Sequence, residues 1–413
     1  MPKQSKFNTL SIQDLQLKNQ RVLLRVDFNV PIDAASGKIL DDTRIIAAIP
    51  TIQKIIQSGG TAILLSHLGR PKDRSKTFSL QPIAQRLSEL LKQPVLFLHD
   101  SIGPDVKKAI SKMHPGDVAL LENVRFYPAE ENPEVDKNFA KNLAELADCY
   151  VDDAFGAAHR AHSSIVEVAK YFPGKAASGY LLEKEMAFLG QILDQPAHPF
   201  YAIIAGAKVS TKLGILKKII VKMDGIFIAG GMAFTFLKAK GIPVGDSPIE
   251  ESMLDEAKAF LIECEKKKIP LFLPEDIVAA TQFDNNASYK TFSIQNSPGG
   301  IGIPTGYQGM DIGKKTVEIW RKELQSAKLI FWNGPVGVFE MDNFDKGTIA
   351  IAQILAEMKG RAITIAGGGE TCAAIQKAGL TSHFSHISTG GGACLEYIEH
   401  STLPGIDALS KQP

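Results

Sequence analysis

Residues 384–396 read Phe-Ser-His-Ile-Ser-Thr-Gly-Gly-Gly-Ala-Cys-Leu-Glu, a pattern that predicts a short strand, a tight turn and the start of a helix. Glycine has no Cβ, so the backbone N–H groups of such a turn can approach a ligand closely. The first N–H groups of a helix have no partner within the helix and lie at the positive end of its dipole. Gly390 to Gly392 are therefore a candidate site for an anion, most often phosphate. A run of three glycines is also typical of a simple helix cap, so the phosphate interpretation depends on whether the pattern recurs.

The same order of strand, glycine-containing or polar loop, and helix recurs along the chain. Apolar runs predict strands at residues 21–26, 61–65, 95–98, 118–121 and 149–151, and in the second half at 200–204, 225–228, 270–273, 329–332 and 362–365. Strands that alternate with helices form parallel sheets with helices on both faces. Ligands of such sheets bind at the carboxyl ends of the strands, where these loops are expected.

The length of 413 residues exceeds what one hydrophobic core usually serves, so we expect two domains. Residues 180–193 predict one helix, which we interpret as the connection between them. The predicted fold is α/β, with two doubly wound parallel-sheet domains, Rossmann-like and three-layered, joined by a helix and a hinge. The helix that begins after Asp42 should be kinked or interrupted at Pro50. Residues 281–309 are polar and glycine-rich, so irregular structure or a small hairpin is expected there.

The composition excludes several classes of protein. A net charge of +1 favours neither nucleic acid nor an anionic membrane as a partner. The four cysteines are scattered without a CxxC spacing, which suits a reducing compartment and argues against a disulfide framework or a zinc site. The first residues do not resemble a signal peptide, and no apolar stretch approaches the ~20 residues that span a bilayer. We expect a cytoplasmic protein.

Basic and polar side chains follow the predicted strands of the first half. They are Asp27, Asn29, Arg44, His67, Arg70, Arg125, Arg160 and His162. The fork of an arginine matches carboxylate and phosphate oxygens in a bidentate way. Several arginines in one cleft would bind a small substrate with more than one anionic group. Each arginine could instead pair with a surface carboxylate, and the pattern alone leaves both interpretations open.

The loops of the second half contain mainly glycine and lysine. They include Gly206, Lys208, Lys212, Gly230, Gly231, Gly334, Gly337, Gly367 to Gly369, and Gly390 to Gly392. This suits a nucleotide, whose phosphates bind backbone N–H groups and whose ring needs a close apolar slot. The Walker spacing and the GxGxxG pattern are both missing from the sequence, so a P-loop ATPase and a typical dinucleotide dehydrogenase lose support.

An ordered set of motifs resembles the phosphoglycerate kinase family. The motifs are RVDFNVP (25–31), SHLGRP (66–71), LENVRF (121–126), DAFGAAHRAHSS (153–164), GAKVSTK (206–212), WNGPVGVFE (332–340), GGGET (367–371) and FSHISTGGGA (384–393). They occur in the order typical of the family and span nearly the whole chain. The resemblance implies a hinge-bending enzyme of two domains that transfers a phosphoryl group between 1,3-bisphosphoglycerate and ADP, giving 3-phosphoglycerate and ATP. The sequence contains no evident dimer-forming segment, so a monomer is the default expectation.

The resemblance also implies a division of the chain. Residues 1–179 would bind phosphoglycerate, 180–197 would form the connecting helix, 198–394 would bind the nucleotide, and 395–413 would pack back on the first domain. The expected acid-binding residues are Asp27, Phe28, Asn29, Arg44, His67, Leu68, Gly69, Arg70, Arg125 and Arg160. The expected nucleotide-binding residues are Gly206, Lys208, Lys212, Gly309, Asn333, Glu340, Gly368, Gly369, Glu370 and Thr371. The expected catalytic residues are Arg44, Lys208, Gly391 and Gly392. Mg²⁺ would bind with ATP or ADP and contact Glu370 indirectly, through phosphates or water.

The chain departs from the pattern of the family at a few positions. Ala205 stands for a frequent glycine, Thr211 and Glu370 for aspartate, Lys314 for proline and Cys394 for serine. Glutamate is one methylene longer than aspartate, so the reach of Glu370 to a metal ion or bound water must differ. Two other classes stay open: a different nucleotide-dependent α/β kinase or ligase, and a catalytically inactive relative kept for binding.

Overall fold

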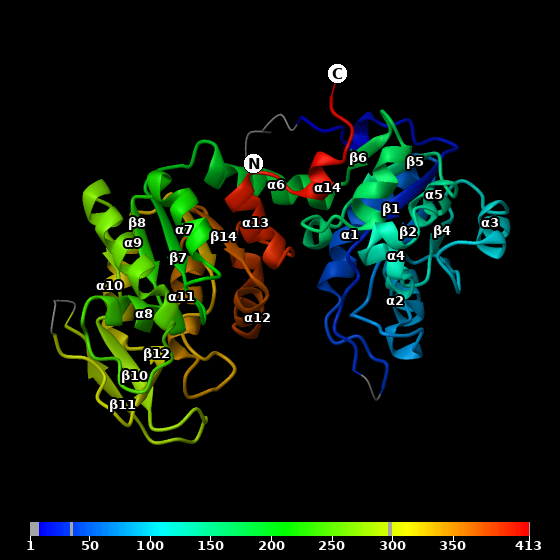
Figure 1. Ribbon diagram of the computed structural model, residues 1–413. Helices are drawn as coiled ribbons and strands as arrows, with labels where there is room; N and C mark the ends of the chain where they lie inside the picture. The colour runs from blue at the N-terminus through cyan, green and yellow to red at the C-terminus, as the bar shows by residue number, and fades with distance from the viewer. Residues whose placement is uncertain (1–7, 34–35, 296–299, 413) are drawn as a thin grey trace. The chain divides into compact units, whose positions relative to one another are not determined.

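The computed structural model describes residues 8–33, 36–295 and 300–412 (Figure 1). The described residues up to Ala187, together with those from Thr402 onward, form one compact unit, and Phe188–Ser401 form the other. The domain boundaries expected from the sequence were residues 179, 197 and 394. The contacts instead divide the chain after Ala187, inside the helix that begins at Tyr180, and after Ser401. Within the described ranges, no helix is long and apolar enough to cross a membrane.

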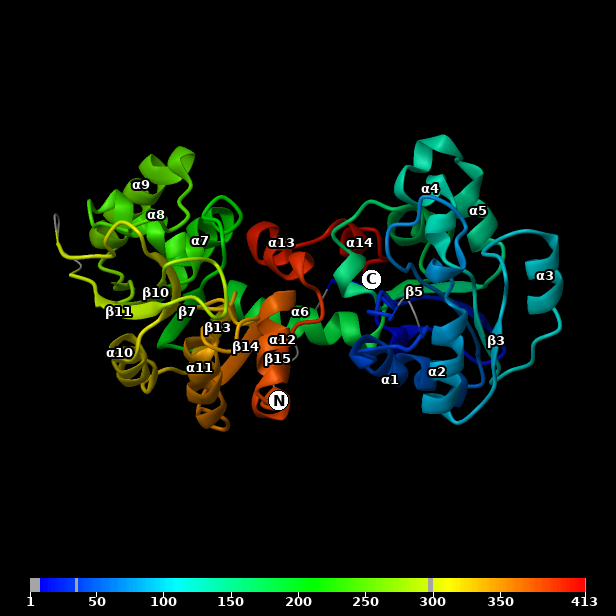
Figure 2. The ribbon, with the colours of Figure 1, turned by 90° about the horizontal axis from the view of Figure 1, so that it is seen from below.

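The first unit contains a parallel sheet with the strand order β3-β4-β2-β1-β5-β6. Its strands are β1 (Arg21–Arg25), β2 (Thr61–Leu65), β3 (Val95–Phe97), β4 (Val118–Leu120), β5 (Cys149–Asp152) and β6 (Ala176–Ser178). Its helices are α1 (Thr43–Gln57), α2 (Gln81–Leu91), α3 (Pro104–Ile110), α4 (Pro128–Glu131), α5 (Asn138–Ala144), the first part of α6 (Tyr180–Leu193) and α14 (Pro404–Asp407). Figure 2 shows α1 and α2 on one face of the sheet and α4 and α5 on the other.

Helix α1 runs without a break through Pro50, so the expected interruption is wrong. Proline removes the hydrogen bond that the carbonyl of residue 46 would accept within the helix. Pro50 is exposed and Ile46 is 48% exposed, so this carbonyl lies on the side of α1 that water can reach. The buried side of the helix, which contains Ile45, Ile52 and Ile55, packs in the core and holds the helix together.

The second unit has the same architecture, with the parallel strand order β15-β14-β13-β7-β8-β9. Its strands are β7 (Phe200–Ile204), β8 (Gly225–Ile228), β9 (Leu271–Phe272), β13 (Leu329–Asn333), β14 (Ile363–Gly367) and β15 (His386–Ile387). Its helices are α7 (Leu213–Ile219), α8 (Gly231–Ala239), α9 (Leu254–Lys267), α10 (Lys314–Leu324), α11 (Lys346–Glu357), α12 (Gly369–Lys377) and α13 (Gly392–His400). Figure 2 shows α7, α8 and α9 on one face of this sheet and α10 and α11 on the other.

Most strands of the two parallel sheets are buried along most of their length, the exceptions being the edge strands β3 and β9. Strands β2, β5, β8 and β13 are buried at every residue. Near-continuous apolar runs of this kind are typical of parallel strands that are covered by helices on both faces. The predicted α/β class and the doubly wound parallel sheets are therefore confirmed.

A separate antiparallel sheet lies in the second unit, with the strand order β11-β10-β12. Its strands are β10 (Asp276–Ala280), β11 (Tyr289–Ser293) and β12 (Gln308–Ile312). The sequence analysis expected irregular structure or a small hairpin over residues 281–309. The structure has a three-stranded sheet instead of a two-stranded hairpin. The sequence did not reveal it, because β11 is mostly exposed and polar and the third strand, β12, begins only at Gln308.

The last residues of the chain lie beside the start of it. The backbone N–H of Leu10 donates to the carbonyl of Ser410 at 2.8 Å, and the N–H of Ser410 donates to the carbonyl of Ala176 at 2.9 Å. These bonds join Ser410 to Leu10 near the start of the chain and to the edge strand β6. Helix α13, by contrast, belongs to the second unit together with the glycines that precede it.

Candidate functional site

The loops after β1 and β2 are tied together in the first unit. Asp27 Oδ1 accepts a hydrogen bond from the N–H of Asn29 at 3.1 Å, and Asn29 Oδ1 accepts one from the N–H of Gly69 at 2.9 Å. Gly69 has a positive φ of 60°, and a Cβ there would lie 2.6 Å from the ring of Phe78. The turn at Gly69 therefore needs glycine for both its conformation and its packing.

Phe28 and Leu68 have buried side chains, at 0% and 5% exposure. Their backbone N–H groups donate to Ser66 Oγ at 2.9 Å and to Asn123 Oδ1 at 3.3 Å. These two predicted residues hold the loops in position, and their side chains belong to the core.

Arg44 is the second residue of α1 and lies beside the first loop. Its Nη1 is 3.2 Å from Asp27 Oδ2 and donates to the carbonyl of Asn29 at 2.9 Å. Two predicted site residues thus pair with each other.

Arg125 follows β4 in a short 3₁₀ turn, Val124–Phe126. Its Nη1 donates to the carbonyl of Gly69 at 2.6 Å, and its Nε lies 3.0 Å from Glu131 Oε1. Burial lowers its pKa from the usual value, the charge of Glu131 opposes this, and the charge of Arg160 adds to the lowering. Arg125 and Arg160 are therefore close enough to repel each other.

Arg160 and Arg70 differ in how they are held. Arg160 Nε contacts His159 Nε2 at 3.2 Å. Arg70 is exposed, and it makes no hydrogen bond or ion pair with any residue that the structure describes. The structure thus places Arg160 beside Arg125, while no contact ties Arg70 to the cluster.

His67 lies in the middle of these charges and is 7% exposed. Burial lowers its pKa well below the usual value, and the positive charges of Arg25, Arg125 and Arg44 and the nearby His162 lower it further. His67 is therefore a neutral imidazole at neutral pH. We call Arg25, Arg44, His67, Arg125 and Arg160 the basic cluster.

Arg25 is a member of the basic cluster that was not among the site residues expected from the sequence. It ends β1, is 1% exposed, and donates from Nε to Ser164 Oγ at 2.8 Å. Ser164 in turn contacts Glu130, which is fully buried. The signal was present in the sequence, because an arginine inside the apolar run 21–26 can be buried only with hydrogen-bonding partners.

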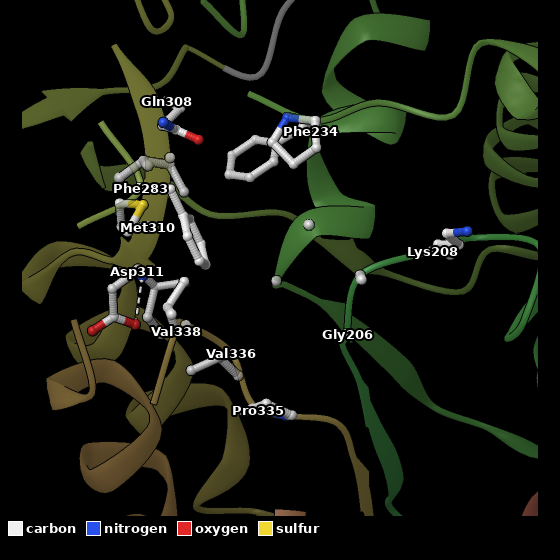
Figure 3. Close-up of a pocket in the computed structure, with 18 of the residues that line it drawn as sticks. Gly206, Lys208, Phe234, Phe283, Gln308, Met310, Asp311, Pro335, Val336 and Val338 are labelled. Atoms are coloured by element: carbon white, nitrogen blue, oxygen red, sulfur yellow. Dashed lines mark hydrogen bonds between the residues drawn. The ribbon is translucent and has the colours of Figure 1, made fainter. Parts of the chain in front are cut away.

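The second unit contains a cavity of about 350 Å³ at the carboxyl ends of its strands (Figure 3). We call it the glycine cavity. The residues expected from the sequence that line it are Gly206, Lys208, Gly230, Gly231, Gly309, Gly337, Glu340 and Glu370. The lining residues that the sequence analysis did not single out are mostly apolar, among them Phe234, Ile277, Phe283, Met310, Val336 and Val338. Figure 3 shows Phe234 and Phe283 across the cavity from Pro335 and Val336.

Glycines bring two loops of this cavity into direct contact. Gly230, with φ of 65°, ends the loop after β8, and a Cβ there would lie 2.7 Å from the backbone N of Gly206. A Cβ on Gly231 would lie 2.9 Å from the carbonyl O of Ala207. The loop after β7 therefore rests on the start of α8, and any side chain at these positions would separate them.

The remaining predicted nucleotide residues lie outside the cavity lining. Lys212 Nζ donates to Asn333 Oδ1, and Asn333 Nδ2 donates to the carbonyl of Gly367 at 2.7 Å. Thr371 Oγ1 accepts from the N–H of Gly334 at 2.7 Å. Burial lowers the pKa of Lys212, which the charge of Glu370 opposes, so this lysine lies near the cavity carboxylate. Gly368 has φ of 94° and precedes Gly369, the first residue of α12.

The glycines with which the sequence analysis began are at the start of α13. Gly391 is the N-cap, with φ of 54°, and Gly392 is the first helical residue. A Cβ on either glycine would meet no atom within 4 Å, so space is open in front of this helix N-terminus. Within the described ranges, no group of three or more His, Cys, Asp or Glu side chains is arranged to hold a metal ion.

The chain is similar to known proteins along almost its whole length. The sequence profile of the phosphoglycerate kinase family matches residues 12–401. A phosphoglycerate kinase of Chlorobium phaeobacteroides is 48% identical over 97% of this chain and 99% of the relative. One from a Synechococcus is 47% identical over the full length of both chains. The solved structure of phosphoglycerate kinase from Coxiella burnetii is 39% identical, covers 97% of this chain and 98% of that chain, and superimposes with a TM-score of 0.84.

Proposed function

The chain belongs to the phosphoglycerate kinase family, and from this premise we propose that it catalyses reversible phosphoryl transfer between 1,3-bisphosphoglycerate and ADP, giving 3-phosphoglycerate and ATP. Membership of the family makes the protein a glycolytic kinase that acts on small molecules. We also propose that the enzyme works as a monomer in the cytoplasm.

The acid would bind to the basic cluster and the nucleotide to the glycine cavity. The observation that carries this division is the gathering of Arg25, Arg44 and Arg125 around the neutral His67. Such a cluster suits a small molecule with a carboxylate or acyl phosphate at one end and a phosphate at the other. Asp27, Asn29, Arg70 and Arg160 would complete the set of side chains around it.

The nucleotide would place its ring in the apolar part of the glycine cavity. Phe234, Phe283 and Met310 supply apolar walls there, and Glu340, which is exposed and lines the same cavity, would accept hydrogen bonds from ribose hydroxyls. Lys208 and Lys212 would contact the phosphates. Gly206, Gly309, Asn333, Gly368, Gly369 and Thr371 would approach the nucleotide through backbone or short polar groups.

Mg²⁺ fits the chemistry of this site. Glu370 offers a hard carboxylate ligand, is exposed, and lines the glycine cavity. We propose that Mg²⁺ enters with ATP or ADP and that Glu370 contacts it through water or phosphate oxygens. When bound, the ion would supply positive charge at the phosphates.

Transfer would proceed in line and directly from one substrate to the other, without a covalent enzyme intermediate. Phosphoryl transfer needs alignment and neutralisation of charge on the moving group more than it needs a general base. Arg44, Lys208 and the N–H groups of Gly391 and Gly392 are the proposed stabilisers. Because each proposed set of binding residues belongs to one unit, we propose that hinge closure brings the substrates together and excludes water.

The test is ATP consumption with 3-phosphoglycerate and Mg²⁺, drawn forward by a dehydrogenase that removes 1,3-bisphosphoglycerate. We expect turnover with 3-phosphoglycerate and none with glycerate, which lacks the second anionic group. Folded protein that binds ATP but turns over neither acid would contradict the proposal. Turnover with glycerate would instead contradict the role of the basic cluster.

A further inference from the structure

We infer that the buried chain Glu130–Ser164–Arg25 fixes His67 as the neutral tautomer with its proton on Nε2, so that His67 presents one oriented N–H donor to the acid. The inference deepens the proposed function and rests on it only for the identity of the acid. Glu130, Ser164 and Arg25 are positioning residues in this scheme, since they act through His67.

The direction of the first link is set by a carboxylate. Glu130 is 0% exposed, and it accepts from the N–H of Ser164 at 2.9 Å and from Ser164 Oγ at 2.6 Å. Burial opposes its ionised form, but hydrogen bonding from His162 and the charge of Arg25 outweigh burial and lower its pKa. An ionised carboxylate can only accept hydrogen bonds. The single hydroxyl proton of Ser164 is therefore directed at Glu130.

The next link follows because the only proton of the Ser164 hydroxyl is already used in the hydrogen bond to Glu130. Ser164 Oγ has only lone pairs left for Arg25 Nε, which lies 2.8 Å away. Arg25 also donates from Nη1 to the carbonyl of Val26. These two bonds hold the plane of the guanidinium, and its third edge, Nη2, lies 3.2 Å from His67 Nδ1.

A guanidinium has donors and no acceptor, so His67 Nδ1 must accept. A neutral imidazole carries one N–H, and with Nδ1 as acceptor that proton is on Nε2. Among the residues that the structure describes, no hydrogen-bond partner is found for Nε2. The donor is thus available to a ligand, while the arginines supply the charge.

The surroundings of His67 keep it neutral. The charged or titratable groups that act on it are Arg25 at the end of β1, Arg44 on α1, Arg125 after β4, and His162. All four lower its pKa, in addition to burial. The nearby carboxylate is Glu130, which lies 3.6 Å from His162 Nδ1 and accepts the hydrogen bonds of Ser164. Its negative charge therefore interacts with these two residues. Hydrogen bonding by His67 should therefore be independent of pH across the neutral range.

If the hydrogen-bonded residues Glu130, Ser164 and Arg25 had only a structural role, the tautomer of His67 would not be fixed. If Glu130 and Ser164 only compensated the buried charge of Arg25, His67 would be free to adopt either tautomer. The two interpretations differ in one measurable quantity, the position of the imidazole proton in the enzyme without substrate.

The experiment is ¹⁵N NMR of the full-length enzyme labelled at histidine, without substrate, with His67 assigned by the resonance lost in His67→Gln. We expect Nε2 to give the protonated signal and Nδ1 the unprotonated one throughout the neutral pH range. In Arg25→Met we expect the Nδ1-protonated form to appear and the pKa of His67 to rise.

Arg125→Met is the matched control. It removes an equal charge that also lowers the pKa of His67, but Arg125 makes no hydrogen bond to the ring. We expect its pKa effect without a change of tautomer. If Arg25→Met does not fold, Ser164→Ala decides, because it removes the anchor of Arg25 and should shift part of the His67 population to the Nδ1-protonated form. Wild-type His67 protonated on Nδ1, the same tautomer in both arginine variants, or no shift in Ser164→Ala with Arg25→Met unfolded would overturn the inference.

A second measurement joins the tautomer to binding. Adding 3-phosphoglycerate should shift the Nε2 resonance, and the KM for this acid should rise roughly tenfold in Ser164→Ala, the scale of one weakened hydrogen bond to a charged group. The expected tautomer together with no response to 3-phosphoglycerate and no turnover would refute the proposed function but not the proton position. Turnover with the other tautomer would refute the inference alone.

Discussion

The basic cluster of the first unit and the glycine cavity of the second are built from different parts of the chain. The basic cluster uses long charged side chains, and a buried chain of polar groups behind it holds Arg25 and His67 in place. The loops of the glycine cavity contact each other through their backbones. This contact requires Gly206, Gly230 and Gly231, because a side chain at Gly230 or Gly231 would separate the loops. The difference teaches how each site can fail: the first by losing one side chain, the second by gaining one methyl group.

The largest effect is expected from a truncation in the basic cluster. Arg44→Ala should lower kcat by roughly 100-fold or more, the scale for losing one preorganised stabiliser of transition-state charge. The measurement is kcat in the coupled assay. The control is Arg321→Ala, which removes a partly exposed arginine paired with Glu357 on the surface of the second unit. We expect that variant to behave like the wild type, since exposed pairs contribute little. A folded Arg44→Ala enzyme with nearly normal kcat would contradict the proposed role.

The glycine cavity should respond to an addition instead. Gly230→Ala would put a Cβ 2.7 Å from the N of Gly206 and 2.9 Å from its O, at a backbone φ of 65°. The loop after β7 must then move, so the KM for ATP should rise about tenfold, with a smaller change in the KM for 3-phosphoglycerate.

Gly360→Ala separates backbone strain from crowding. Gly360 also has a positive φ, of 81°, but a Cβ there would meet no atom within 4 Å. Both variants should lose about 1–3 kcal/mol of unfolding free energy from strain, measured by denaturant titration. Only Gly230→Ala should change the KM for ATP. Equal effects of both on that KM would show that the contact between the two loops is unimportant.

The apolar runs of the sequence were sufficient to predict most of this architecture. Strands such as β2, β7 and β8 begin and end where those runs do, because a strand covered on both faces must be apolar throughout. The antiparallel sheet escaped because β11 is polar and exposed, and a half-exposed strand has no such run. The contacts between loops that distinguish the two sites are seen only in the structure, since a sequence cannot show which loops touch.

Site residues could be predicted only where they belong to a recognisable local sequence pattern. Gly206 and Lys208 were found because a glycine-rich loop after a strand is a recognisable pattern, and they do line the cavity. Phe234 and Met310 were missed because an apolar residue that lines a cavity has the same local pattern as one in the core. Likewise, Ser164 has no local feature that predicts its bond to Arg25, which lies 139 residues away in the chain.

The two sites should also differ in their response to pH. His67 is already neutral, whereas burial raises the pKa of Asp311, a residue that lines the glycine cavity, to about 8, partly offset by hydrogen bonds from Gly347 and Ile312. A carboxyl with a raised pKa binds its proton more tightly in the folded state than in the unfolded state. Its contribution to stability is therefore present below the unfolded value of 3.8 and is lost as the pH rises to about 8.

Asp311→Asn tests this difference, because asparagine does not titrate. The unfolding free energy of the wild type should fall relative to that of the variant as the pH rises from about 5 to about 9, with denaturant titrations at several pH values as the measurement. The matched control in the basic cluster is His67→Gln, whose difference from the wild type should stay constant over the neutral part of this range. A difference for Asp311→Asn that is flat with pH would show that the carboxyl remains ionised throughout.

The smallest effect is expected at the rim of the glycine cavity, at Glu250. Its carboxylate accepts from the N–H of Ser210 at 3.0 Å and from Ser210 Oγ at 2.6 Å, while its own N–H donates to Thr235 Oγ1 of α8 at 3.1 Å. Glu250 thus ties the loop that contains Lys208 to α8. We expect Glu250→Ala to raise the KM for ATP roughly two- to fivefold, the scale of exposed hydrogen bonds, and Glu250→Gln to raise it less, since one bond survives.

The neighbouring exposed Glu251 provides the control for this last prediction, because Glu251→Gln removes the same charge without touching Ser210. Burial raises the pKa of Glu250, but the hydrogen bonds of Ser210 and the nearby charge of Lys208 outweigh burial and lower this pKa. Glu250 therefore places a negative charge near Lys208. Removing that charge alone should strengthen the binding of an anionic nucleotide. A lower KM for ATP in both Glu250 variants would therefore mean that charge outweighs positioning at this rim, and the loop would then be held by its contact with Gly230 and Gly231 rather than by a side chain.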